Sequence, residues 1–242
     1  MVAPLGLVDY AWTSSSDSRP YINTIMYRHN IRKRYGYLDR PLFDKKIKEF
    51  TYKVILSGKS GTGKTSTVAK LSGQEVSKLH RETPGIEQTT ILWPCRLIGS
   101  KEPVIFKLKF CDAGEGCMAR FNHILPTLKE NADGVIFFFA MTDRSSFEDI
   151  PQQMSKVLGE QSSNIAKLVI ATKLDQHGRS EVPQKELIEF EKQYNIPIIG
   201  VSNFNAGPVD PSHNALHTSA PILNCLCERL WYRDQQEAGH VV

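Results

Sequence analysis

A glycine-rich segment, Gly58–Thr65, constrains the fold of this chain more than any other feature. Its sequence, GKSGTGKT, satisfies the pattern G-x-x-x-x-G-K-[S/T], in which backbone N–H groups converge on phosphate oxygens because glycines leave the loop unobstructed. The apolar run within Tyr52–Ser57 is typical of a buried strand, and Thr65–Leu71 has the pattern of a helix. A helix that begins here points its N-terminus at the same anion. The sequence therefore predicts a phosphate-binding loop between a strand and a helix.

The residue types in this loop indicate a nucleotide with a divalent cation. Lys64 is expected to neutralise charge on the β- and γ-phosphates, and the Thr65 hydroxyl is expected to ligate Mg²⁺. The remaining predicted contacts to the phosphates come from Ser60, Gly61, Thr62, Gly63 and Ser66.

The rest of the chain alternates extended and helical patterns, which predicts an α/β layered sheet. Thr89–Ile98 and Val104–Cys111 flank a Gly/Ser/Pro-containing turn and are typical of an antiparallel hairpin. A long Pro/Gly/Asn-rich loop is expected over Asn203–Thr218. Further strands are predicted at Val135–Ala140, Leu168–Ala171 and Ile196–Val201, and helices at Ser146–Leu158, Pro183–Tyr194 and Ala220–Tyr232.

A second motif, Thr172-Lys173-Leu174-Asp175, follows a predicted buried strand and favours guanine over adenine. A carboxylate here could accept hydrogen bonds from guanine N1–H and N2–H₂, whereas adenine lacks that pair of donors and would leave Asp175 unpaired. Lys173 could lie over the base.

From Phe50 to Tyr232, the spacing of these motifs resembles the Ras-superfamily small GTPases. Thr83 follows Thr65 by 18 residues, where that family has its switch I threonine, and Thr172–Asp175 resembles its guanine motif N-K-x-D. Ser202 and Asn203 stand where the family's backbone touches the guanine oxygen. The resemblance implies a P-loop NTPase fold, with a mostly parallel six-stranded sheet flanked by helices over residues 50–235, that binds GTP or GDP with Mg²⁺.

The segment Cys111–Glu115 departs from the family's switch II pattern D-x-x-G-Q. Either Asp112 keeps the role beside Mg²⁺ in a turn that is one residue short, or Gly114 keeps its register and Cys111 replaces the aspartate. We favour Asp112 because a carboxylate has a clear use next to the metal's ligands. The resemblance places Lys64 and Glu115 in the catalytic positions, with Thr65, Thr83 and Asp112 around the metal. Since Glu115 stands where glutamine orients the attacking water, slow hydrolysis is expected.

Two readings of the function follow from these departures. In the first, GTP and Mg²⁺ order Thr83 and the Gly114 backbone, and the chain acts as a switch that engages an effector. In the second, the chain is a scaffold subunit that holds nucleotide with little or no hydrolysis. Threonine in place of asparagine at position 172 is expected to weaken, but not abolish, guanine binding.

More narrowly, the chain resembles the Rem/Rab-like small GTPases of the ciliogenesis and planar polarity effector (CPLANE) complex. The features that carry this resemblance are the basic N-terminal arm, the short switch II, Thr172, and a C-terminal Gly-His-Val-Val without a prenylation box. The resemblance implies a role in cilium assembly and planar cell polarity, with Fuzzy and Inturned as partner subunits. It also implies a cytoplasmic location at the basal body.

The net charge of +4 is concentrated in residues 1–49, which hold nine Lys and Arg against five Asp and Glu. We expect this arm to be partly disordered over residues 1–20, with an amphipathic helix at Ile22–Tyr37. It could dock on a protein partner or contact an acidic membrane surface peripherally. A nucleic-acid role is not expected because the body is neutral. Residues 236–242 are expected to be a short tail without a prenyl anchor.

Overall fold

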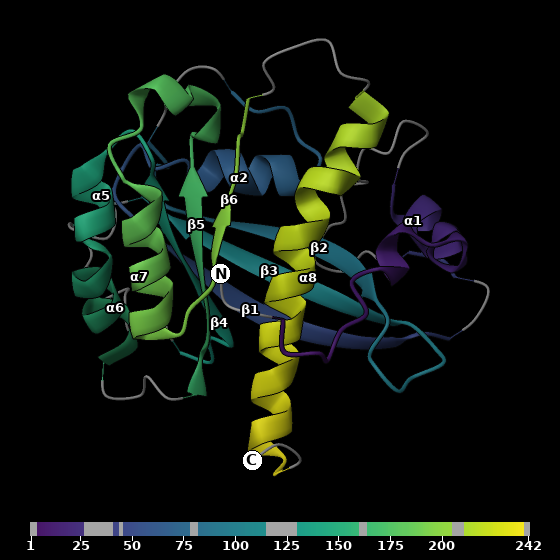
Figure 1. Cartoon of the computed structure of the whole chain (residues 1–242). Coiled ribbons are helices and arrows are strands. Elements are labelled where there is room, and N and C mark those ends of the chain that lie inside the picture. Colours follow the sequence, from purple (N-terminus) through teal and green to yellow (C-terminus); the bar gives the residue numbers. More distant parts are fainter. Residues whose placement is uncertain are drawn as a thin grey trace.

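A mostly parallel sheet organises the computed structural model, which describes residues 4–26, 41–43, 46–77, 82–114, 130–159, 164–204 and 211–239. Within these residues, six strands lie in the order β2-β3-β1-β4-β5-β6 (Figure 1). Strands β2 and β3 form the predicted antiparallel hairpin, and all other neighbours are parallel. This confirms the predicted fold class. The strands are β1 (Lys48–Ser57), β2 (Ile86–Cys95), β3 (Val104–Ala113), β4 (Gly134–Ala140), β5 (Ala166–Thr172) and β6 (Ile198–Gly200).

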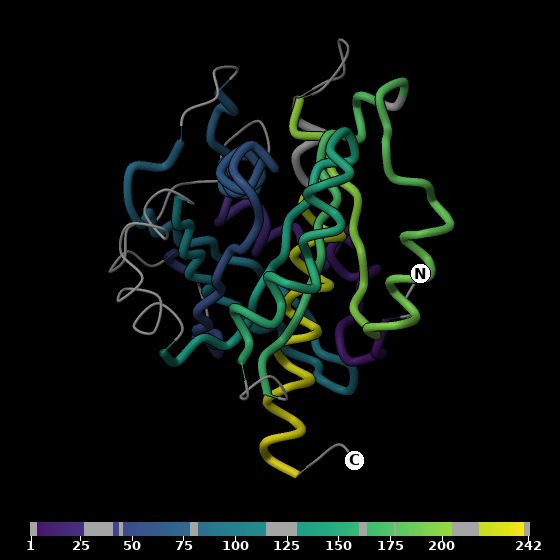
Figure 2. The backbone as a smooth tube through the Cα atoms, turned by 90° about the vertical axis from the view of Figure 1, so that its left-hand side faces the viewer, coloured from purple at the N-terminus to yellow at the C-terminus, as the bar shows by residue number. Residues whose placement is uncertain are grey.

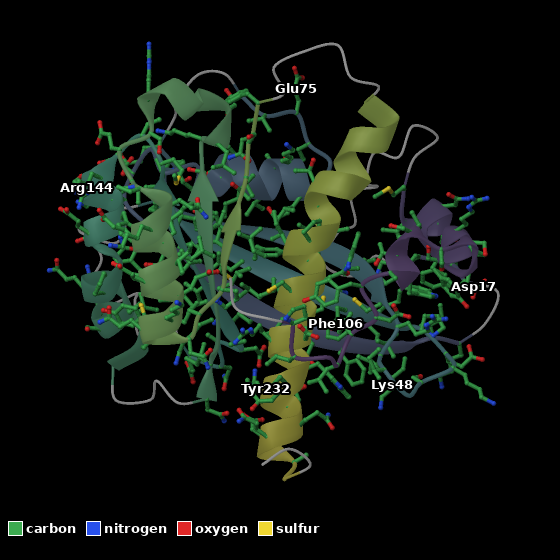
Figure 3. All side chains as sticks on the ribbon, viewed as in Figure 1. Asp17, Lys48, Glu75, Phe106, Arg144 and Tyr232 are labelled. Atoms are coloured by element: carbon green, nitrogen blue, oxygen red, sulfur yellow. The ribbon has the colours of Figure 1, made fainter. Side chains whose placement is uncertain are left out.

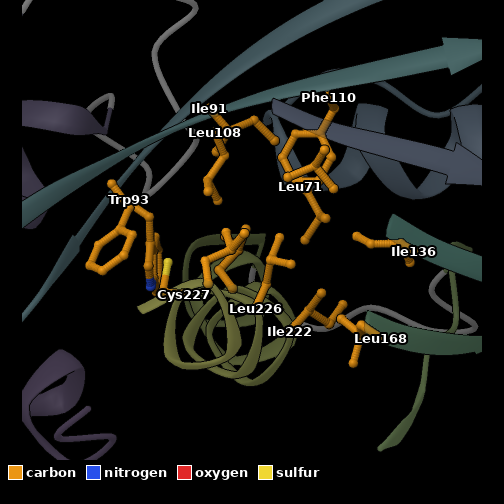
Figure 4. Close-up of a cluster of buried hydrophobic side chains, with 14 of the residues drawn as sticks. Leu71, Ile91, Trp93, Leu108, Phe110, Ile136, Leu168, Ile222, Leu226 and Cys227 are labelled. Carbon is orange, nitrogen blue, oxygen red and sulfur yellow. The ribbon is translucent and has the colours of Figure 1, made fainter. Parts of the chain in front are cut away.

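Helices cover both faces of the sheet, which explains why β4 and β5 are almost continuously apolar. On one face lie α2 (Lys64–Leu71) and the long α8 (Pro211–Glu237) (Figure 1). Their apolar side chains, among them Leu71 and Leu226, pack against β1 to β5 in the cluster of Figure 4. The opposite face is covered by α5 (Arg144–Glu148), α6 (Ile150–Leu158) and α7 (Gln184–Tyr194).

Two predicted boundaries on the helices need correction. The helix predicted at Ser146–Leu158 is divided at Asp149. The second helix begins at Ile150, and Pro151 lies in its first turn, where a helix tolerates proline. The helix predicted at Ala220–Tyr232 is longer at both ends, since α8 spans Pro211–Glu237, and the loop predicted over Asn203–Thr218 is correspondingly shorter. The polar and small residues of this segment are typical of turns, which is why the sequence predicts a loop. Each residue added to a helix that is already anchored on the sheet, however, gains a backbone hydrogen bond at little entropic cost.

The N-terminal arm is also more ordered than the sequence predicts. Residues 4–26 include the short helices η1 (Trp12–Ser14), η2 (Ser16–Ser18) and α1 (Arg19–Ile25), so the expected disorder is wrong for residues 4–20. Val8 bridges to Leu97 beside the edge strand β2, and Trp12 is buried. The predicted amphipathic helix ends at Ile25, and the part of it from residue 27 to Tyr37 lies outside the described residues.

A buried carboxylate holds this arm in place. Glu228 of α8 is 1% exposed and accepts hydrogen bonds from the backbone of Leu5 and Leu7 at 3.0 Å and from the Tyr10 hydroxyl at 2.9 Å. Isolated apolar residues such as Trp12 give no periodic signal in the sequence. The hydrogen bonds to Glu228 satisfy polar groups of the segment just before Trp12, which offsets the cost of burying them.

Different helices lie at the two ends of the sheet. The last turns of α8 extend beyond the strands at one end, whereas the start of α2 lies toward the other, where β5 and β6 finish (Figures 1 and 2). In a parallel sheet, ligands bind at the carboxyl ends of the strands. No helix in the described part of the chain is both long and apolar enough to cross a membrane.

Candidate functional site

A cavity of about 470 Å³ opens where the glycine-rich loop meets the carboxyl ends of the strands. Its wall also includes Glu75, which lies at the upper end of the molecule in Figure 3. The sequence-predicted residues that line the cavity are Ser60, Gly61, Gly63, Lys64, Thr65, Ser66, Thr83, Gly114, Lys173, Asp175 and Asn203. Four other predicted residues within the described part of the chain do not line the cavity: Thr62, Asp112, Thr172 and Ser202. Each of them forms a hydrogen bond with the glycine-rich loop or with α2.

The glycine-rich loop wraps around the Lys64 ammonium. Gly63 precedes α2 with a φ of 87°, a left-handed conformation that glycine adopts without steric cost. The Lys64 Nζ donates to the carbonyl oxygens of Gly58 at 2.7 Å and Lys59 at 3.1 Å. A positive charge is therefore held across the loop, next to the N-terminus of a helix, and both favour an anion.

Three oxygen-bearing side chains converge beside this loop. The Thr65 hydroxyl donates to Asp112 Oδ2, and the Thr65 and Thr83 hydroxyl oxygens lie 3.1 Å apart. The Thr83 hydroxyl is 3.5 Å from the same carboxylate oxygen. Asp112 is only 4% exposed, and its other oxygen, Oδ1, is buried without a hydrogen-bond partner. Hydroxyl and carboxylate oxygens are the ligands that Mg²⁺ prefers, so this donor set fits the ion.

Strand alternation determines which residue of switch II reaches this cluster. Asp112 shares its face of β3 with Phe110, which packs in the same cluster as Val68 and Leu71 of α2. Cys111 points to the opposite face, and burial raises the pKa of its thiol, which keeps it uncharged. The structure thus brings Asp112, and not Cys111, beside Thr65.

Gly114 allows the segment after β3 to lie directly against Thr83. A Cβ atom at Gly114 would come within 2.0 Å of the Thr83 carbonyl oxygen, so only glycine fits this arrangement. The Gly114 N–H also donates to the Gly85 carbonyl at 3.2 Å. The predicted switch residues Thr83 and Gly114 are therefore in contact, whereas Glu115 lies outside the described residues.

The predicted guanine motif contributes Lys173 and Asp175 to the wall of the same cavity. Asp175 follows β5 in η4 (Leu174–Arg179), and its Oδ1 is buried without a partner. The Thr172 hydroxyl lies 2.7 Å from the Thr62 carbonyl and 3.1 Å from the Phe139 carbonyl, as a donor shared between them. Threonine therefore provides a connection from the guanine motif to the glycine-rich loop, despite lacking an amide.

The loop after β6 contributes contacts that the sequence analysis did not identify. The Asn203 side-chain amide donates to the Thr67 hydroxyl at 3.0 Å, and Lys70 Nζ donates to the Ser202 carbonyl. Burial lowers the pKa of Lys70, and the Asp175 charge opposes that shift. The sequence gives no signal for these contacts, because they join α2 to a loop more than a hundred residues away. Phe204 was also missed, and its only signal was an aromatic residue directly after Ser202-Asn203.

Comparison with known proteins assigns this arrangement to a family. The model of the Ras family matches residues 53–220. The chain is 42% identical to ciliogenesis and planar polarity effector 2 of Xenopus laevis, over 97% of this chain and 96% of that protein. It is 38% identical to the human protein of that name, over 94% of this chain and 90% of that protein. The Ras-related protein RABA4b of Arabidopsis thaliana is 26% identical, over 70% of this chain and 72% of that protein.

The Thr172 hydroxyl provides a test of the link between the two halves of the site. Thr172→Val keeps the shape of the side chain but leaves the Thr62 and Phe139 carbonyls without this donor. We expect the free energy of unfolding, measured in urea, to fall by about 1–2 kcal/mol. As a control, Thr89→Val at a half-buried position near the start of β2 should change it by less than about 0.5 kcal/mol. Equal unfolding free energies for Thr172→Val and wild type would show that the hydroxyl does not stabilise the site.

Proposed function

Because this chain belongs to the Ras family, we propose that it binds guanine nucleotides with Mg²⁺ and acts as a switch that engages a protein effector complex in its GTP-bound state. The similarity to ciliogenesis and planar polarity effector 2 covers nearly the whole chain and supports a cilium-related role. Location at the basal body, and Fuzzy and Inturned as partner subunits, belong to this proposal.

Two buried oxygen atoms carry the proposal. In the described part of the chain, Asp112 Oδ1 and Asp175 Oδ1 are the only buried side-chain nitrogen or oxygen atoms without a hydrogen-bond partner. An unpaired buried carboxylate oxygen is costly, so such atoms are expected where a ligand supplies the partner. Asp112 lies beside the Thr65 and Thr83 hydroxyls, and Asp175 lies in the cavity wall near the guanine motif. These positions support a nucleotide whose phosphates and metal ion bind beside Asp112, at the phosphate end of the cavity, and whose base binds beside Asp175, at the base end.

The proposed roles follow from what each residue can donate or accept. Lys64 and the backbone N–H groups of Ser60–Thr65 bind the phosphates, with Thr62 and Ser66 completing the loop. Thr65 and Thr83 ligate Mg²⁺, and Asp112 orients the Thr65 hydroxyl from behind. When bound, Mg²⁺ supplies positive charge against the β- and γ-phosphates. Asp175 accepts from guanine and Lys173 lies over the base, while Ser202 and Asn203 provide backbone contact.

The switch is proposed to lie in the contact between Thr83 and Gly114. These residues come from separate segments, before β2 and after β3, and their close approach places both at the cavity wall. A γ-phosphate held between them would bias both segments toward a single arrangement. The effector would recognise that arrangement. The basic arm is proposed as a separate docking element, and six of its bases lie outside the described residues (Arg28, Arg32, Lys33, Arg34, Arg40 and Lys45).

The guanine contact is tested by Asp175→Asn. Asparagine can accept from N1–H but presents a donor where the guanine 2-amino group also donates, whereas xanthine has a carbonyl there. We expect GDP affinity to fall by about a hundredfold or more and xanthosine diphosphate affinity to rise, both measured by calorimetry with Mg²⁺. Asp17→Asn, an exposed change on the arm, should alter neither affinity. If Asp175→Asn binds GDP as tightly as wild type, Asp175 does not contact the base.

Hydrolysis is expected to be slow, because a carboxylate at Glu115 repels the γ-phosphate and has no amide N–H with which to orient water. In a single-turnover assay with GTP, Glu115→Gln should raise the intrinsic rate by about tenfold or more. The same change at the exposed Glu87 of β2 should leave the rate unchanged. Fast intrinsic hydrolysis by wild type would refute this expectation. Hydrolysis too slow to detect in both proteins would favour the alternative of a nucleotide-holding scaffold.

A further inference from the structure

One aromatic side chain distinguishes the base end of the cavity. Among the described residues that line the cavity, Phe204 is the only aromatic one. It is 40% exposed, which makes it one of the few large apolar side chains in the described structure that remain open to solvent. The other exposed large apolar side chains of the described residues do not line the cavity, whereas this ring lies in its wall, where a flat ligand can cover it.

The backbone next to Phe204 is fixed from α2. The Asn203 amide donates to the Thr67 hydroxyl at 3.0 Å and approaches the Gly63 carbonyl at 3.4 Å. Lys70 donates to the carbonyl of the preceding residue, Ser202. These bonds connect the loop after β6 to the helix that begins at the phosphate-binding loop. The ring therefore comes directly after two residues that hydrogen bonds join to α2.

The cavity already contains groups for the edges of a base and for the phosphates. Asp175 offers a buried oxygen that needs donors, and the glycine-rich loop with Lys64 provides the anion site. Lys173 is proposed to lie over one face of the base, and neither Asp175 nor the phosphate loop serves the other face. Stacking on an aromatic ring serves that face and does not depend on which purine is present.

We propose that Phe204 is the residue on which the nucleobase stacks, so that Phe204 supplies affinity while Asp175 supplies selectivity for guanine. This inference rests on the proposed function, because it requires that the cavity binds a purine nucleotide. A bound base covers the exposed ring, and the hydrogen bonds of Ser202 and Asn203 to α2 hold the segment just before the ring beside the phosphate loop.

The experiment compares Mg²⁺-GDP with Mg²⁺-IDP, whose base lacks the 2-amino group, in calorimetric titrations. Phe204→Ala should weaken both nucleotides by the same factor, about ten- to a hundredfold. Asp175→Ala should weaken GDP more than IDP, because the missing amino group is one that Asp175 contacts. Ile188→Ala, a similar loss of an exposed apolar side chain on α7, should change neither affinity.

Two further readouts separate stacking from a structural role. Without nucleotide, Phe204→Ala should unfold at the same urea concentration as wild type, since the ring is half open to solvent. Phe204→Trp should retain GDP binding, and GDP should quench its fluorescence beyond any change in wild type, which contains Trp12, Trp93 and Trp231.

The outcomes distinguish a failure of stacking on Phe204 from a failure of the proposed nucleotide binding. If wild type binds GDP and Phe204→Ala binds it equally well, stacking on Phe204 is refuted and the proposed function stands. A lower unfolding midpoint that accounts for the affinity loss would likewise refute stacking, because the ring would then support the fold. If wild type binds neither nucleotide, the proposed function fails first.

Discussion

The contact of Thr65 and Thr83 with the Asp112 carboxylate is the constraint on which the rest of the site depends. It joins the start of α2, the segment before β2 and the end of β3 in one buried polar cluster. A carboxylate that is 4% exposed is tolerated only where donors or a cation compensate for lost water. The Thr65 and Thr83 hydroxyls lie against one oxygen of Asp112, and the other oxygen is buried without a hydrogen-bond partner. Gly114 lies against Thr83 in the same arrangement, and Lys64, which the carbonyl oxygens of Gly58 and Lys59 hold, directly precedes Thr65.

Sequence patterns predicted the sheet because the residues that identify its strands are contiguous in the chain. The apolar run in β4 is buried along its whole length, and the motif Gly58–Thr65 specifies both its turn and the helix after it. The arm was misjudged because Val8 and Trp12 are isolated apolar residues whose burial depends on β2 and Glu228, far away in the chain. Propensity and periodicity describe local structure and contain no information about such distant partners.

In the candidate site, too, the sequence identified residues of contiguous motifs but not contacts between distant residues. Residues in contiguous motifs, such as Lys64, Thr65 and Asp175, were named from the sequence and line the cavity. The choice between Cys111 and Asp112 depended on strand register, because a shift of one residue reverses the face to which a side chain points. The hydroxyl of Thr172 and the amide of Asn203 could not be assigned partners, since the Thr62 carbonyl and Thr67 lie more than a hundred residues away in the chain.

The central claim is that this chain binds a guanine nucleotide together with Mg²⁺. It is tested most directly by calorimetric titration of the wild-type chain with GDP, in Mg²⁺ and in EDTA, followed by ADP in Mg²⁺. Removal of Mg²⁺ is expected to weaken GDP binding by about tenfold or more, and ADP is expected to bind about a hundredfold more weakly than GDP. Equal affinities for GDP and ADP, or no nucleotide binding at all, would contradict the claim.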